Sequence, residues 1–180
     1  MRLSFLLALV VFVFSASQCN PEAESEKRKK EFEAQSPEKQ KEILIEANKR
    51  FSEQEDLLIE QYVSRRKIKF SKTGRGLRYF IHNPNSNPRA QSGEYAKIDY
   101  TVKLLNGDTC YSSKNKNPEV FLIERDNVES GLHEGIQLMG VGEKATFIIP
   151  SHLAHGLLGD RNKIPPRATL IFDIHLIALK

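Results

Sequence analysis

The chain has 180 residues, of which 27 are Lys or Arg and 23 are Asp or Glu, so its formal net charge is only +4. This mixed charge, with no aromatic side chains interleaved along a basic face, argues against nucleic acid as a partner. The length is enough for one domain with an appendage.

The first 18 residues have the pattern of a secretory signal. A positive start, Met1-Arg2, precedes an apolar run from Leu3 to Phe14, which is too short for a comfortable membrane span. In one interpretation the signal is cleaved and the cysteine that follows, Cys19, is incidental. We favour a bacterial lipoprotein signal that is cut before Cys19, whose thiol then carries lipid, although Gln18 is bulkier than the residue usual at that place.

Lipidation would set the compartment of the protein. An acyl anchor on Cys19 would hold the chain on a membrane surface, so we expect a periplasmic protein anchored to the cell envelope, most readily at the outer membrane. The anchor also explains the abrupt change to a polar tether over residues 19–35, which has the composition of solvated helix or disorder. Cys110, the other of the two cysteines, then has no partner, so no intrachain disulfide is expected.

Residues 36–76 are expected to form a charged helical stalk. Ser36 and Pro37 suit an N-cap and a first helical position. The pattern Ser52-x-x-Glu55 has the form of a capping box and predicts the start of a second helix, with the better apolar face and an end near Arg65. The stalk can pack on the flank of the following domain or pair with another chain in a homodimer, and we favour packing on the same chain.

Alternating apolar residues predict strands in the rest of the chain. A break at Thr73–Gly76 precedes a strand over Leu77–Ile81, and a turn-rich loop, Asn83–Pro88, precedes a second strand over 96–104. In the closing segment every even position from 168 to 178 is apolar. A period of two sustained this long indicates a strand with one face buried.

One short helix is predicted among these strands. Leu132, Ile136 and Met139 recur at i, i+4 and i+7, which places them on a single helical face. A short helix among alternating strands predicts an α+β fold, in which an antiparallel β-sheet wraps around one short helix. The α-helical N-terminal stalk precedes this domain, which we expect to span residues 77–180.

Six motifs in this region, in the same order and at nearly the same spacing, resemble the FKBP-type peptidyl-prolyl isomerases. The resemblance covers roughly residues 93–180. The motifs are Lys97-Ile-Asp-Tyr-Thr-Val102, Asn106-Gly107, Tyr111-Ser-Ser113, Ser130-Gly-Leu-His-Glu-Gly135, Val141-Gly-Glu-Lys144 and Ile164-Pro-Pro166 through Phe172.

The family resemblance implies prolyl isomerisation, whose barrier of about 18–20 kcal/mol reflects the amide resonance that must be broken. No covalent intermediate, metal or cofactor is needed. A pocket that excludes water favours the twisted transition state over the planar amide, and a hydrogen-bond donor helps further. The site implied is therefore an apolar bowl with polar groups at its rim, and the partners implied are proline-containing client polypeptides.

Carried over onto matching positions, the resemblance implies catalytic roles for Tyr100, Phe172 and His155. Tyr100 and Phe172 match aromatic walls. Each of them alone would favour core, whereas the two together on the matching frame favour the pocket. The remaining residues implied to bind substrate are Cys110, Tyr111, Val128, Glu129, Leu132 and Ile164.

Several of these positions depart from the family pattern. Cys110 and Tyr111 stand where drug-binding members have phenylalanine and a ligand-polarising aspartate, and Glu119 replaces a second pocket phenylalanine. Leu132 replaces the tryptophan of the pocket floor, which predicts a deeper pocket or a refilled one. Glu129 keeps a backbone N–H donor, and His155 replaces a tyrosine that reaches the ligand.

With the lipoprotein signal and the stalk, Ser130–Gly135 and Pro150–Leu157 resemble the gliding-motility-associated FKBP-type isomerases of Bacteroidetes-like bacteria. That resemblance implies a membrane-tethered folding helper for exported envelope proteins. The alternative is a non-catalytic chaperone or binding module that holds client chains in the same pocket. We favour the enzyme.

The sequence also contains residue types that could form a metal site or a nucleophilic pair. His133, His152 and His155 with Glu134 could be metal ligands, but a metal site needs convergent geometry and the helix should bury Leu132 rather than His133. Cys110 and His155 could form a nucleophilic pair, but nothing in the sequence orients the base. We favour neither, and expect no metal.

Overall fold

The structure is a computed structural model that describes residues 21–114 and 116–180. The predicted signal and Cys19 therefore lie outside the described residues. The chain divides into two compact units, residues 1–48 and 49–180, and the division falls inside a helix. No helix of the described residues is long and apolar enough to cross a membrane.

In the first unit the described residues are helical. Helix α1 (Pro21–Glu33) buries no residue and carries ion pairs one turn apart, such as Lys30 with Glu26 at 3.1 Å. Helix α2 (Pro37–Ser64) begins as expected, because Ser36 Oγ accepts a hydrogen bond from Lys39 N–H at 3.3 Å.

Helix α2 runs without a break through Ser52, so the predicted second helix start is wrong. No glycine or proline lies between Pro37 and Ser64 to interrupt the helix. Glu55 does not close a capping box either, because its carboxylate accepts hydrogen bonds from Ser151 and Thr169. The predicted end near Arg65 is confirmed.

In the second unit, the last part of α2 packs against the sheet, as the favoured interpretation expected. Ile59 is fully buried against Ile148 and Ile171. Leu57 and Leu58, on another face of the helix, stay exposed. Pairing of the stalk with another chain therefore stays an untested possibility of the sequence.

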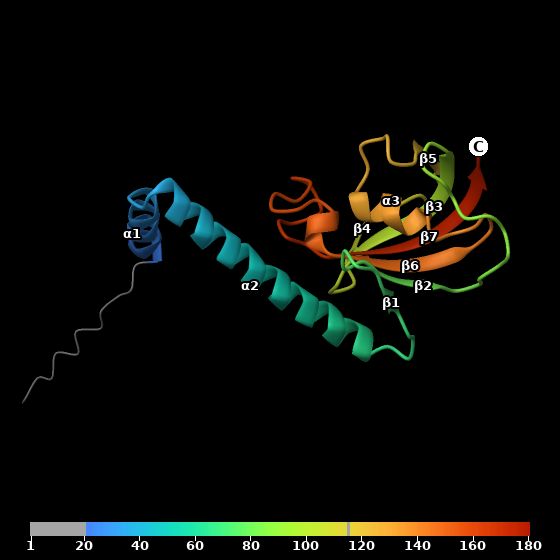
Figure 1. The fold of residues 1–180 in the computed structure, drawn as a ribbon. Helices are drawn as coiled ribbons and strands as arrows, with labels where there is room; N and C mark the ends of the chain where they lie inside the picture. The colour runs from blue at the N-terminus through green and yellow to red at the C-terminus, as the bar shows by residue number, and fades with distance from the viewer. Residues whose placement is uncertain (1–20, 115) are drawn as a thin grey trace, which may run out of the picture. The chain divides into compact units, whose positions relative to one another are not determined.

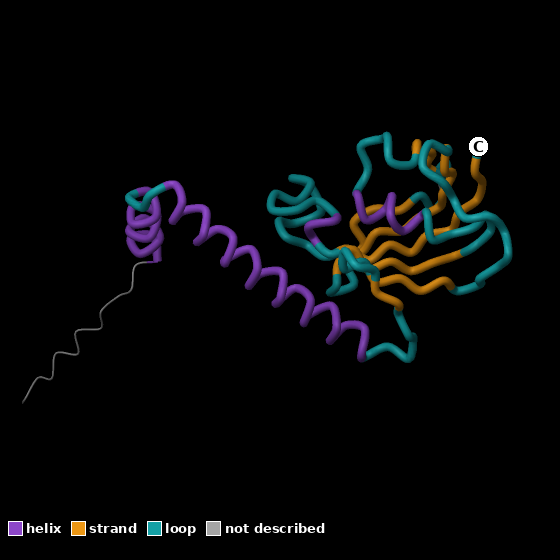
Figure 2. The backbone as a smooth tube through the Cα atoms, viewed as in Figure 1, coloured by secondary structure: helices purple, strands orange, loops and turns teal. Residues whose placement is uncertain are grey.

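The second unit contains a seven-stranded antiparallel sheet with the order β1-β2-β6-β7-β3-β4, in which β5 also pairs with β3 (Figures 1 and 2). This arrangement confirms the predicted fold class. The strands are β1 (Ser71–Lys72), β2 (Arg78–Ile81), β3 (Tyr95–Leu104), β4 (Thr109–Ser112), β5 (Glu119–Leu122), β6 (Lys144–Ile149) and β7 (Leu170–Leu179).

Helix α3 (Ser130–Ile136) lies across one face of this sheet (Figure 1). Two glycines allow the close approach: a Cβ on Gly131 would lie 2.4 Å from Ile149 Cγ2, and one on Gly135 would lie 2.5 Å from Phe147 Cε2. Leu132, Ile136 and Met139 are buried, as their spacing predicts. The core therefore sits between α3 and the inner face of the sheet.

The two long central strands fix which side chains face α3. Along β3, Ala96, Ile98 and Val102 are buried, and β7 buries Leu170, Phe172, Ile174 and Leu176 in the same way. Direct pairing of Val102 with Phe172 and of Tyr100 with Ile174 aligns the two strands. Because side chains alternate along a strand, these residues form one continuous apolar face.

Candidate active site

A cavity of about 260 Å³ opens on the inner face of the sheet beside α3. Each wall comes from a different element: β3 and β7 supply the sheet side, α3 and the residues before it supply the floor, and the segment between β6 and β7 supplies the rim. The lining residues are Ile98, Tyr100, Val102, Tyr111, Glu119, Val128, Glu129, Leu132, His155, Asp160 and Phe172.

The aromatic wall consists of Tyr100 from β3 and Phe172 from β7. Their ring centroids lie 6.5 Å apart with an interplanar angle of 31°. Burial, followed by a hydrogen bond to Glu119, raises the pKa of Tyr100 to about 12. The phenol is thus neutral at physiological pH and remains a hydrogen-bond donor.

Glu129 and His155 form a polar pair at the rim. Glu129 lies directly before α3, and its Oε1 is 2.9 Å from Nε2 of His155. Both side chains are partly buried. The pair therefore holds the rim segment, the connection Ser151–Thr169 between β6 and β7, against the start of α3. The N–H group of Glu129 has no backbone partner among the described residues and is available to a ligand.

Tyr111 and Asp160 form a second polar pair on the other side of the opening. The Tyr111 hydroxyl donates to Asp160 Oδ2, while Asp160 Oδ1 accepts hydrogen bonds from the N–H groups of Asn162 and Ile164, each at 2.8 Å. Desolvation raises the pKa of Asp160, but these hydrogen bonds outweigh it and lower that pKa to about 2. The same contact raises the pKa of the Tyr111 phenol.

The structure brings most of the site residues predicted from sequence into this one pocket. Those that line it are Tyr100, Tyr111, Val128, Glu129, Leu132, His155 and Phe172. Leu132 is among them, on the side of the cavity formed by α3.

Two predicted residues lie outside the pocket lining. Cys110 is buried, and its Sγ lies 3.7 Å from the carbonyl oxygen of Lys163. Burial raises the pKa of its thiol, which disfavours the thiolate that a nucleophilic role requires. Ile164 is also buried, and its N–H group donates to Asp160.

Asp160 is the polar pocket residue that the sequence analysis missed; the apolar Ile98 and Val102 also line the pocket without having been predicted as site residues. The family pattern drew attention to Tyr111 as the site of a lost aspartate, but a carboxylate reaches Tyr111 from the rim segment instead. A local signal existed: Asp160 follows a glycine of positive φ (Gly159, 65°), and aspartate readily accepts hydrogen bonds from nearby backbone N–H groups in such turns.

The remaining histidines considered as metal ligands have other partners. Nδ1 of His133 accepts a hydrogen bond from Glu124 N–H at 2.9 Å, and Nε2 of His152 lies 3.0 Å from the Arg75 carbonyl oxygen. Within residues 21–114 and 116–180, no group of three or more His, Cys, Asp or Glu side chains is placed to hold a metal ion.

A larger, open hollow of about 840 Å³ lies over polar side chains that include Asp99, Thr101 and Asp173. These positions alternate with the buried ones and so face away from α3. Asp173 is already engaged, by Thr146 Oγ1 at 2.8 Å and by Lys103 Nζ at 2.8 Å. The smaller pocket, with aromatic and aliphatic walls and a few polar groups at its rim, is the better candidate site.

Comparisons with known proteins agree with this fold. A protein named probable FKBP-type peptidyl-prolyl cis-trans isomerase FkpA from Neisseria meningitidis is 36% identical over 108 residues, 59% of this chain and 39% of that protein. FK506-binding protein 2 of Dictyostelium discoideum is 42% identical over 92 residues, 51% of this chain and 69% of that protein. The chain thus spans well under half of the first of these relatives.

Solved structures show the same fold. The crystal structure of AtFKBP13 matches with a TM-score of 0.58 and 33% identity, covering 62% of this chain and 99% of that one. FkpA from Escherichia coli matches with a TM-score of 0.63 and 25% identity, covering 88% and 73%. The family model described as FKBP-type peptidyl-prolyl cis-trans isomerase matches residues 87–177, which is half of the chain. The chain therefore belongs to the FKBP-type peptidyl-prolyl cis-trans isomerase family.

Proposed function

We propose that the chain accelerates cis–trans isomerisation of Xaa-Pro bonds in client polypeptides, in the pocket between Tyr100, Phe172 and Leu132. The observation that carries this proposal is the composition of that pocket. Its walls are aromatic and aliphatic, while polar groups from Glu129 and His155 stand at the rim. A proline ring fits such a bowl, and the adjoining amide reaches the rim.

The pocket acts on the amide without forming a bond to it. Breaking the amide resonance costs about 18–20 kcal/mol in water, and transfer into an apolar site disfavours the polar planar amide more than the twisted one. The N–H group of Glu129 donates to the substrate carbonyl oxygen. Tyr100, whose hydroxyl stays protonated, keeps the aromatic wall neutral against the proline ring.

The test is cis–trans exchange of a Leu-Pro or Phe-Pro tetrapeptide, followed by NMR with residues 20–180 of the chain. NMR needs no coupling protease, which could cleave the helical stalk. Phe172→Ala should lower kcat/KM by about tenfold or more, equivalent to ~1.4 kcal/mol of transition-state stabilisation. Phe172→Leu should act in the same direction with less loss of stability, because it leaves a smaller cavity.

Ile123 supplies the control, because it is fully buried in the same core cluster but does not line the pocket. Ile123→Ala should lower the melting temperature and leave kcat/KM within about twofold of the parent. Exchange that the parent protein fails to accelerate, or that Phe172→Ala and Ile123→Ala slow equally, would contradict the proposal.

A second candidate function is a non-catalytic chaperone that holds client chains at the same pocket. Leu157 and Leu158 favour it, since they are 57% and 66% exposed on the rim segment directly after His155. A refolding protein limited by proline isomerisation separates the two candidates, because an isomerase speeds the slow phase and a holdase slows it or leaves it unchanged.

The cellular setting is proposed from the sequence. The signal pattern ending at Cys19 and the charged stalk support a periplasmic protein held by lipid to the envelope, with exported envelope proteins as clients. The resemblance of Ser130–Gly135 and Pro150–Leu157 to the gliding-motility-associated isomerases supports clients in that machinery or in secretion.

A further inference from the structure

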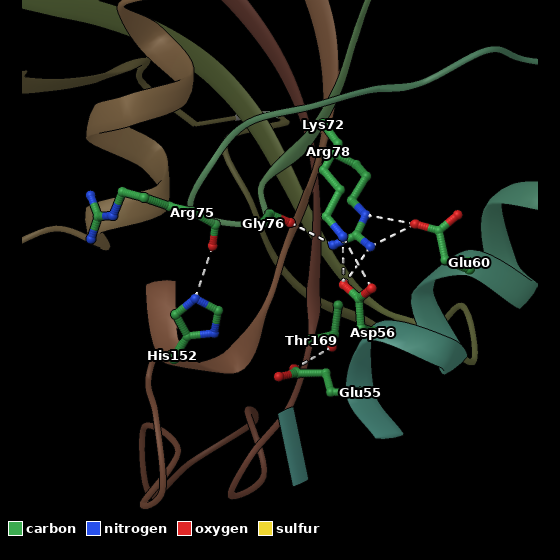
Figure 3. Close-up of polar contacts among 9 residues, drawn as sticks. All are labelled: Glu55, Asp56, Glu60, Lys72, Arg75, Gly76, Arg78, His152 and Thr169. Carbon is green, nitrogen blue, oxygen red and sulfur yellow. Dashed lines mark hydrogen bonds and ion pairs between the residues drawn. The ribbon is translucent and has the colours of Figure 1, made fainter. Parts of the chain in front are cut away.

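Glu55 is a buried carboxylate on α2, far along the chain from the pocket residues. Its side chain is 6% exposed and accepts three hydrogen bonds. Oε1 accepts from Ser151 N–H at 2.7 Å and from Thr169 Oγ1 at 2.6 Å, and Oε2 accepts from Ser151 Oγ at 2.9 Å. Figure 3 shows Glu55 directed at Thr169 from the helix.

The two residues that Glu55 joins are the ends of the rim segment, which we define as Ser151–Thr169. Strand β6 ends at Ile149 and β7 begins at Leu170, so this segment is the whole connection between them. It carries His155 and Asp160, both of which line the pocket. One carboxylate from the stalk helix therefore fixes the entry and the exit of the segment that forms the rim.

After the short turn Ser151–Leu153 the rim segment contains no helix or strand, and its own hydrogen bonds, such as Arg167 N–H to the Gly156 carbonyl oxygen at 2.8 Å, are few. Arg161 and Arg167 have positive φ. For a residue other than glycine such a conformation persists only where surrounding contacts enforce it. A second contact from α2 reaches the same segment, because the Arg167 guanidinium lies 4.5 Å from the centroid of the Phe51 ring.

We propose that Glu55 is a positioning residue for the isomerase pocket. By holding Ser151 and Thr169 together it sets the place of His155 against Glu129 and of Asp160 against Tyr111. The stalk helix thereby forms part of the catalytic unit. This inference rests on the proposed isomerase function for its kinetic test, and on the rim contacts for its structural one.

A neighbouring polar cluster provides the contrast that the test needs. Arg78, only 2% exposed, contacts Glu60 at 2.6 Å, Asp56 at 2.5 Å and the carbonyl oxygen of Gly76 at 2.7 Å (Figure 3). This cluster joins the same helix to β2 but includes no residue of the rim segment. Glu60→Ala therefore weakens the helix–sheet junction without releasing Ser151 or Thr169.

The experiment compares Glu55→Ala, Glu55→Gln and Glu60→Ala by NMR exchange of a Leu-Pro tetrapeptide, using residues 20–180, which include every described element. Glu55→Ala should lower kcat/KM by about tenfold, because small misplacements of rim groups are costly for catalysis. Glu55→Gln keeps an acceptor for Ser151 and Thr169 and should stay within about threefold of the parent. Glu60→Ala should keep kcat/KM within about twofold of the parent, even if it lowers the melting temperature as much as Glu55→Ala does.

Amide chemical shifts give a readout that stability alone does not move. Glu55→Ala should shift the N–H signals of Asn162 and Ile164, which donate to Asp160, and Glu60→Ala should leave them in place. Equal kcat/KM in the parent and Glu55→Ala, or the same shifts in Glu60→Ala, would overturn the inference. Should Glu55→Ala fail to fold, Thr169→Val removes one of the three hydrogen bonds and should show the same changes at smaller amplitude.

Failure of the proposed function has a different signature. A parent protein that does not accelerate exchange refutes the isomerase, and the inference is then decided by the Asn162 and Ile164 shifts and by line broadening of the added peptide. Shifted Asn162 and Ile164 signals together with lost peptide broadening in Glu55→Ala, and neither change in Glu60→Ala, support a positioning role in a binding pocket. Unchanged shifts and broadening in Glu55→Ala reject it.

Discussion

Among single residues, Asp160 has the environment with the clearest consequence for pH. Its folded-state pKa of about 2 is below the ordinary value of 3.8, so ionised Asp160 stabilises the fold. Because the folded pKa is depressed, this contribution is fully present above about pH 4 and is lost as the pH falls toward 2.

Asp160→Asn tests this linkage. The difference in free energy of unfolding between parent and variant should be constant above about pH 5 and shrink steadily between pH 4 and pH 2, as followed by urea denaturation. Tyr111→Phe is the matched control, because it removes the hydroxyl that donates to Asp160. The folded-state pKa of Asp160 should then rise toward its ordinary value of 3.8, so the acid-induced loss of unfolding free energy should move toward pH 4. A parent–variant difference that stays constant down to pH 2 would show that Asp160 titrates normally.

The same residue marks the limit of sequence prediction for the site. Tyr100, Leu132 and Phe172 were predictable because periodic patterns and family motifs fix their strand and helix positions, and Val128, in the bend before α3, was predictable from the family resemblance alone. Asp160 was not, because it reaches Tyr111 through a segment with no periodicity, whose path depends on contacts distant in sequence. Glu55 was misassigned for a related reason: a local capping pattern cannot reveal partners at Ser151 and Thr169.

Among the elements, α3 depends on how closely it approaches β6. The sequence predicted this helix and the burial of Leu132, Ile136 and Met139 correctly, although the helix ends at Ile136 and Met139 lies beyond it. It did not predict the distance to the sheet, which Gly131 and Gly135 set by lacking a Cβ. Because Leu132 forms the pocket floor, the position of α3 also sets the depth of the pocket.

Gly135→Ala should therefore destabilise the protein despite the higher helix propensity of alanine. The new Cβ would lie 2.5 Å from Phe147 Cε2, and overpacking of this kind costs about 1–3 kcal/mol against a propensity gain of up to about 1 kcal/mol. Urea denaturation measures the change in free energy of unfolding. Gly74→Ala is the control, because its Cβ would meet open space, and it should change stability by less than about 0.5 kcal/mol.

At the scale of the whole molecule, a lipid anchor would combine with the rim clamp to give the stalk two functions. Helix α2 would connect the tether to the sheet domain, and its Glu55 would hold the pocket rim. Lipid on Cys19 would then confine the pocket to the membrane surface, where exported chains emerge.

Cys19→Ser tests the anchor in a bacterium that processes lipoproteins. We expect the parent chain, expressed from Met1, in the membrane fraction with an N-terminal peptide that begins at Cys19 and carries acyl chains by mass spectrometry. The variant should lose both the acyl mass and the N-terminus at residue 19, because serine supplies no thiol to carry the lipid. Cys110→Ser is the control, since Cys110 is buried in the sheet domain and its loss should not change fractionation. A parent chain in the soluble fraction, cleaved at another residue and free of lipid, would identify an ordinary secretory signal instead.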